Sequence, residues 1–99
     1  SNVFFIKNNR IFTPSLSSNI LPGITRELLI SEAAKHEVKI MEQDCSLDDL
    51  VNAESVWLTS STKGLAPVSE IINQNSNLDV SHPLFKKCQN IFNDAYFKE

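Results

Sequence analysis

The segment Leu21-Pro22-Gly23-Ile24-Thr25-Arg26 has the residue types of an anion-binding site. It places a glycine immediately before the expected start of a helix, where the first N–H groups have no partners within the helix. These N–H groups and the partial positive charge of the helix N-terminus can hold a phosphate. Gly23 would let the backbone approach the ligand, and the Thr25 hydroxyl would add a donor. A helix that simply begins with Thr25 as its N-cap would show the same residues.

A second polar turn, Thr59-Ser60-Ser61-Thr62, follows an expected strand. Its hydroxyls and backbone N–H groups can bind a phosphate or a carboxylate, although an ordinary polar loop has the same composition. Two such turns in one small chain favour a ligand that carries a phosphate.

The chain contains no complete catalytic motif. It has no Gly-x-Ser-x-Gly nucleophile elbow and no His-Glu-x-x-His zinc motif, and Lys63-Gly64 has the reverse order of a Walker A loop. Cys45 and Cys88 are isolated, which predicts two free thiols. His36 and His82 have no partners at metal-ligand spacing, so we expect two surface histidines and no metal site.

Strands and helices alternate along the chain. The expected strands are residues 3–7, 10–13, 38–42 and 55–59, with an extended segment at 66–71. The expected helices are residues 24–36 and 47–52 and a last helix that opens at Ser81-His82-Pro83. Asn8-Asn9 suits a tight hairpin turn, because asparagine tolerates positive φ. This order predicts a compact α/β or α+β unit, with residues 1–99 forming a single domain.

Composition excludes several classes of protein. The 99 residues carry a net charge of -3, and 41% of them are hydrophobic, as in an ordinary globular domain. No apolar run approaches the roughly 20 residues of a membrane span, so no membrane association is expected. The mild negative charge, without a basic block, argues against a nucleic-acid partner. Free thiols in so small a chain predict a cytoplasmic location.

Taken together, the two turns resemble the class IV aminotransferase family, the fold-type IV pyridoxal-phosphate (PLP) enzymes. The segments that carry the resemblance are Ser1–Phe5, Phe12–Pro14, Leu21–Arg26, Ala53–Thr59 and Pro67-Val68. They look like the family's Ser-Asn-x-Phe strand, its Thr-Pro turn, its Leu-x-Gly-Ile-Thr-Arg motif and its Ala-Asp-Glu strand, with Ser55 where glutamate is usual. The resemblance implies the C-terminal half of the family's large domain, a mixed sheet with helices packed around it.

The resemblance also implies roles for individual residues. The backbone N–H groups of Ile24 and Thr25, with the Thr25 hydroxyl, would bind the phosphate of PLP. Ser61 would add a second phosphate contact. The N–H groups around Thr62 and Lys63 would face the carboxylate of a small-molecule amino substrate.

The lysine that forms the Schiff base in this family belongs to an upstream half, as does the glutamate that pairs with the pyridine nitrogen. Lys63 is no substitute, since it lies in the anion-binding turn. We therefore expect no catalytic residue in these 99 residues, and we expect the chain to be inactive alone, as a fragment of a longer homodimeric enzyme. Apolar residues such as Phe4, Leu21 and Trp57 would then lie at a stripped interface.

The reaction of the parent enzyme can be read in two ways from the resemblance. Branched-chain and D-amino-acid aminotransferases usually carry an acidic residue where this chain has Gly64. The 4-amino-4-deoxychorismate lyases carry glycine there, which favours elimination of pyruvate to give 4-aminobenzoate for folate synthesis. Against this, Thr59–Thr62 looks close to the turn of D-amino-acid aminotransferases, so an aminotransferase is the alternative.

A different class of function is a non-catalytic interaction module that happens to contain a Gly-Ile-Thr-Arg helix start. That hypothesis predicts no anion affinity at either turn.

Overall fold

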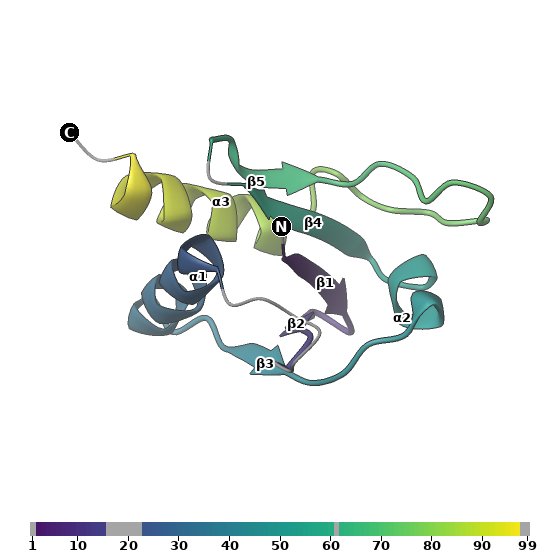
Figure 1. The fold of residues 1–99 in the computed structure, drawn as a ribbon, viewed down its shortest axis with the longest axis horizontal. Helices are drawn as coiled ribbons and strands as arrows, with labels where there is room; N and C mark the ends of the chain where they lie inside the picture. Colours follow the sequence, from purple (N-terminus) through teal and green to yellow (C-terminus); the bar gives the residue numbers. More distant parts are fainter. Residues whose placement is uncertain (1, 16–22, 61, 98–99) are drawn as a thin grey trace.

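The computed structural model describes residues 2–15, 23–60 and 62–97. In chain order its elements are β1 (Val3–Lys7), β2 (Arg10–Thr13), α1 (Ile24–Lys35), β3 (Ile40–Glu42), α2 (Leu47–Val51), β4 (Ser55–Ser60), β5 (Gly64–Pro67) and α3 (Pro83–Tyr96). The strands form one five-stranded sheet in the order β3-β2-β1-β4-β5 (Figure 1). The predicted α/β class and the mixed sheet with helices around it are confirmed.

The direction of each strand follows from its connection. β1 pairs antiparallel with both β2 and β4, and β4 pairs antiparallel with β5. The predicted hairpin between β1 and β2 is confirmed, with Asn8 and Asn9 at φ 53° and 59°. β3 instead runs parallel to β2, because the chain crosses over through α1 before it returns to the sheet.

Helices α1 and α3 cover one face of the sheet (Figure 1). Their buried residues pack against the side chains of β1 and β4 that point to that face, where Trp57 stacks on Phe4 at 5.6 Å and contacts Phe85 at 5.3 Å between ring centroids. Phe5 and Val56 point to the opposite face, since successive side chains of a strand alternate. α2 contributes Leu50 to this second cluster.

The expectation of a stripped interface at Phe4 and Trp57 is wrong, because both side chains are completely buried under the two helices. Leu21 lies outside the described residues. The apolar residue that the sheet leaves open is Leu58, which points to the opposite face and is 40% exposed. On α3, Phe85 is fully buried and Leu84 is half-buried.

The predicted helix at 24–36 and strand at 38–42 are shorter in the structure, and the extended segment predicted at 66–71 is a strand at Gly64–Pro67. α1 ends at Lys35, and Glu37 then turns the chain in the left-handed region at φ 63°, a position where glycine is usual. The Val38 N–H donates to the Ala33 carbonyl at the end of the helix, and the pairing of β3 with β2 starts only at Ile40. β5 ends at Pro67, although the Val68 N–H still donates to the Val56 carbonyl.

The start of α2 forms a capping box. The Ser46 hydroxyl accepts from the Asp49 N–H, and the Asp49 carboxylate accepts from the Ser46 N–H at 2.8 Å. The bond from the Ser46 backbone lowers the pKa of the Asp49 carboxyl below its ordinary value. This aspartate therefore belongs to a helix cap and not to a pair of catalytic carboxylates.

The predicted surface position is correct for His36 and wrong for His82, which is buried at the N-cap of α3. Its Nδ1 accepts from the Leu84 N–H at 3.1 Å, so its Nε2 carries the proton that is shared with Glu54 Oε1 at 2.9 Å. Glu54 also accepts from the Asn9 N–H. The bond from His82 lowers the pKa of the Glu54 carboxyl below its ordinary value.

We expect His82→Ala to lower the free energy of unfolding by about 1–2 kcal/mol at pH 7, because it removes a helix cap and the partner of Glu54. The lowered pKa of the Glu54 carboxyl stabilises the fold fully above the ordinary glutamate pKa, and this contribution is lost as the pH falls through the lower folded value. Urea unfolding at pH 7 and at pH 3 should therefore show that the free energy of unfolding falls less on acidification in the variant than in the wild type. The exposed His36→Ala is the matched control, and equal losses in both variants would contradict the role of His82.

Candidate functional site

Both candidate anion-binding turns lie at one end of the sheet. β2 ends there at Thr13, whose hydroxyl donates to the carbonyl of Val3 at the start of β1. β4 ends at Ser60, which pairs with Gly64 across the β4–β5 turn. Because β1 and β4 are antiparallel, the start of β1 and the end of β4 meet at the same place.

Asn2 connects the two turns. Its N–H donates to the Thr59 hydroxyl at 3.0 Å, and the Thr59 N–H donates to its carbonyl at 2.9 Å. On its other side, a Cβ atom added to Gly23 would lie 2.7 Å from Asn2 Oδ1. Asn2 is therefore paired with the end of β4, and the end of its side chain lies beside the start of α1, where Gly23 leaves room for it.

The N-cap of α1 is Gly23, and the prediction of Thr25 as the cap is wrong. Gly23 is extended at φ -119°, and its carbonyl already accepts the first helical bond from the Glu27 N–H. Thr25 thus lies inside the first turn. Among the described residues, the N–H groups of Ile24 and Thr25 and the Thr25 hydroxyl have no hydrogen-bond partner. These unpaired donors fit a phosphate group.

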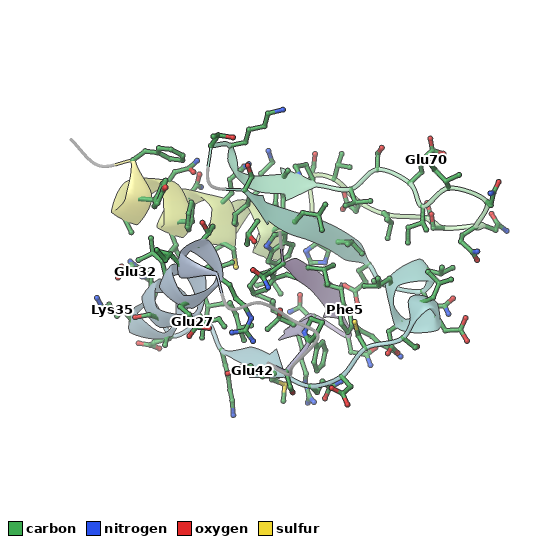
Figure 2. All side chains as sticks on the ribbon, viewed as in Figure 1. Phe5, Glu27, Glu32, Lys35, Glu42 and Glu70 are labelled. Carbon is green, nitrogen blue, oxygen red and sulfur yellow. The ribbon has the colours of Figure 1, made fainter. Side chains whose placement is uncertain are left out.

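Arg26 fixes the first turn of α1 against the sheet. Its side chain is 1% exposed and donates to the Pro14 carbonyl at 3.0 Å and to Glu42 Oε1 at 2.8 Å. It also pairs with Glu27, and Figure 2 shows Glu27 on α1 and Glu42 on β3 on the same side of the molecule. Two carboxylates thus neutralise the guanidinium, so Arg26 positions the helix and does not supply charge to a ligand.

The β4–β5 turn folds around the hydroxyl of Ser60. Ser60 Oγ accepts from the Thr62 N–H at 3.3 Å and from the Lys63 N–H at 3.2 Å. The two N–H groups predicted to face a substrate carboxylate therefore already have an internal partner. Both residues are exposed, and the predicted phosphate contact Ser61 lies outside the described residues.

Gly64 ends this turn, and both its backbone conformation and its close neighbours disfavour a side chain at this position. Its φ is 75°, and an added Cβ atom would lie 3.3 Å from Asn93, Phe92 and Phe97 of the α3 end. A side chain at this position would meet both backbone strain and crowding.

The thiols offer no nucleophile at either turn. Both cysteines are free, as predicted. Burial raises the pKa of the Cys88 thiol to about 12 and also raises the pKa of Cys45, so both stay protonated at neutral pH. Within the described residues, no group of three or more histidine, cysteine, aspartate or glutamate side chains could hold a metal ion. In the same part of the chain, no helix has the length and apolar character needed to cross a bilayer.

Comparison with known proteins identifies the arrangement. The family model for class IV amino-transferases matches residues 1–71, which include Asn2, the start of α1 and the whole β4–β5 turn. The chain belongs to the class IV aminotransferase family. PLP is the cofactor that this family uses, as the resemblance implied.

Individual class IV relatives catalyse different reactions. The chain is 40% identical over 70 residues to branched-chain-amino-acid aminotransferase 5 of Arabidopsis thaliana, covering 71% of this chain and 17% of the relative. It is 31% identical to D-alanine aminotransferase of Bacillus licheniformis, covering 100% of this chain and 35% of the relative. A crystal structure from Legionella pneumophila, assigned provisionally as 4-amino-4-deoxychorismate lyase, has a TM-score of 0.86 and 34% identity and covers 94% of this chain and 34% of that one. The chain thus spans between about a sixth and about a third of the length of these relatives.

The structure brings together most of the predicted site residues of this class IV chain. Ile24 and Thr25 lie at the helix start, and Thr62 and Lys63 lie in the turn at the same end of the sheet. Sequence reasoning missed Asn2 as the link between the turns and Ser60 as the acceptor within the second turn. The Ser-Asn pattern at the chain start and the strand end at Thr59 were the available signals.

We expect Gly64→Ala to cost about 1–3 kcal/mol of unfolding free energy, because alanine at φ 75° is strained and its Cβ meets three atoms at 3.3 Å. Gly23→Ala is the matched control, since its extended φ suits any residue and its Cβ meets only the end of the Asn2 side chain. Thermal and urea unfolding would measure both variants. A larger loss for Gly23→Ala would show that the Asn2 contact, and not the Gly64 turn, limits stability.

Proposed function

We propose that this chain supplies the phosphate-binding part of a PLP-dependent class IV enzyme. The proposal rests on the N–H groups of Ile24 and Thr25 at the start of α1, which have no partner among the described residues. Two N–H donors, a hydroxyl without a partner among the described residues and the positive end of a 12-residue helix lie together there. A phosphate dianion would complete the hydrogen bonding of this helix end.

The other residues of the site would position these donors. Arg26 holds the first turn of α1 against the ends of β2 and β3, and Asn2, which is bonded to Thr59, lies beside Gly23 at the helix start. Neither needs to move when a phosphate binds, so the site would be preorganised. Bound PLP supplies the electron sink of the reaction.

We propose that the substrate carboxylate is received by the β4–β5 turn. The Thr62 and Lys63 N–H groups would exchange the Ser60 hydroxyl for the carboxylate, and the exposed Lys63 ammonium would add charge. Ser61 would give a further phosphate contact, as the family resemblance implies.

The chain alone is proposed to be catalytically inactive. The resemblance assigns the Schiff-base lysine to the upstream half of a homodimeric parent, and Lys63 lies in the anion-binding turn. A cytoplasmic enzyme acting on a small amino substrate remains the proposed context.

Titration of the chain with PLP, followed by backbone amide shifts, tests the phosphate site. We expect shifts at Ile24, Thr25, Ser60 and Lys63, with inorganic phosphate competing for the same residues. Thr25→Ala should weaken binding by roughly tenfold, because it removes one hydrogen bond to a charged group. Ser31→Ala, an exposed hydroxyl on the same helix, should leave the affinity unchanged.

Shifts that avoid the start of α1 would contradict the proposed site. If millimolar PLP shifts no amide in this chain, and the longer parent does not bind PLP either, the result would favour the interaction-module hypothesis.

For the reaction we propose pyruvate elimination from 4-amino-4-deoxychorismate. The support is the constrained Gly64, where the resemblance expects glycine in the lyases and an acidic residue in the aminotransferases. The 34% identity to the Legionella protein also supports it. The identity to the Arabidopsis and Bacillus enzymes supports transfer of an amino group from a branched-chain or D-amino acid as the second candidate.

Assays of the PLP-loaded, full-length parent separate the two reactions. A lyase should release pyruvate and 4-aminobenzoate in equal amounts from 4-amino-4-deoxychorismate when no 2-oxo acid is added as an amino acceptor. An aminotransferase should instead convert 2-oxoglutarate to glutamate in the presence of L-leucine or D-alanine. Turnover of the amino acids alone would overturn the lyase proposal.

A further inference from the structure

A separate cavity of about 530 Å³ lies near the other end of α1. It is formed by β2, by the segment that joins α1 to β3, and by the first turns of α3. Its apolar lining consists of Ile11, Val38, Met41 and Leu84. This volume lies within the range of small-molecule sites, and an unbranched methionine can adapt its shape to a bound ring or chain.

Three cations surround this apolar lining: Arg10 from β2, Lys39 before β3, and Lys87 from α3. Within the described parts of the chain, none of the three forms an ion pair with a carboxylate. Glu37 is the one acidic residue among those that line the cavity. The cavity is therefore locally positive in a chain whose net charge is -3.

We infer that this cavity is a binding site for a small organic anion with an apolar body and a carboxylate. The apolar lining would take the body, and the unpaired cations would take the carboxylate at the rim. A purely inorganic anion would make no use of the apolar lining, and a neutral ligand would make no use of the three positive charges. The combination thus specifies an amphipathic anion.

The cavity is distinct from the phosphate site. α1 separates them, with its N-terminus at the phosphate site and residues 37–39, just past its C-terminus, at the cavity. Twelve residues of helix span about 18 Å at 1.5 Å per residue. The inference therefore does not depend on the proposed enzymatic function, and each site can be tested without the other.

A matched pair of probes tests the site: 1-naphthoate and its neutral isostere 1-naphthamide. Titration of the chain, followed by amide shifts, should place 1-naphthoate against residues 10–11, 37–41, 84 and 87. The naphthamide should bind more weakly by roughly fivefold or more, and raising the salt should weaken only the carboxylate.

The double variant Lys39→Gln/Lys87→Gln should weaken 1-naphthoate binding by roughly fivefold. Lys86→Gln is the control, because Lys86 is also exposed on α3 but does not line the cavity. Both lysines are exposed, so neither substitution should affect folding, and unchanged thermal unfolding would verify this.

Equal affinity for the two probes, or equal affinity of the double variant and the wild type, would overturn the inference. Shifts confined to Leu58 and its neighbours would overturn it too, by placing the probe on the open sheet face. The amide shifts that PLP causes at Ile24 and Thr25 are measured in a separate titration, so a negative result at one site does not affect the result at the other.

Discussion

The pairing of Asn2 with Thr59 is the constraint on which the site depends. It joins residues that lie 57 positions apart and closes the antiparallel pair of β1 and β4 at one end. It thereby places Asn2, whose side chain lies beside Gly23 at the start of α1, next to the end of β4 that leads into the β4–β5 turn. The buried Arg26 adds a second attachment, from α1 to the ends of β2 and β3. Backbone pairing brings the segments together, and one guanidinium fixes the helix.

Local patterns predicted most of the fold. The apolar run Val3–Lys7, the Asn8-Asn9 turn and the short helix that begins at Leu47 each depend on neighbours in sequence, and the structure confirms all three. The Gly-Ile-Thr-Arg segment predicted the helix start for the same reason. Its cap was wrong by two residues, because a glycine carbonyl closes the first helical bond without any side chain.

The errors concern partners that are distant in the sequence. The buried His82 donates to Glu54, which lies just before β4, and no local pattern relates these two residues. Arginine is usually exposed, and Arg26 is buried only because the parallel pairing of β2 and β3 brings Glu42 to it. The cationic cavity was missed for the same reason, since Arg10, Lys39 and Lys87 come from three different elements.

The two edge strands have a consequence for self-association. β3 has three residues, and β5 has four and ends at a proline that cannot donate to a neighbouring strand. Edges this short give an incoming chain few free backbone groups, which is how natural sheets avoid edge-to-edge aggregation. Contacts between copies of this chain would therefore have to use side-chain surfaces, such as the face that carries Leu58, and not the addition of a sixth strand.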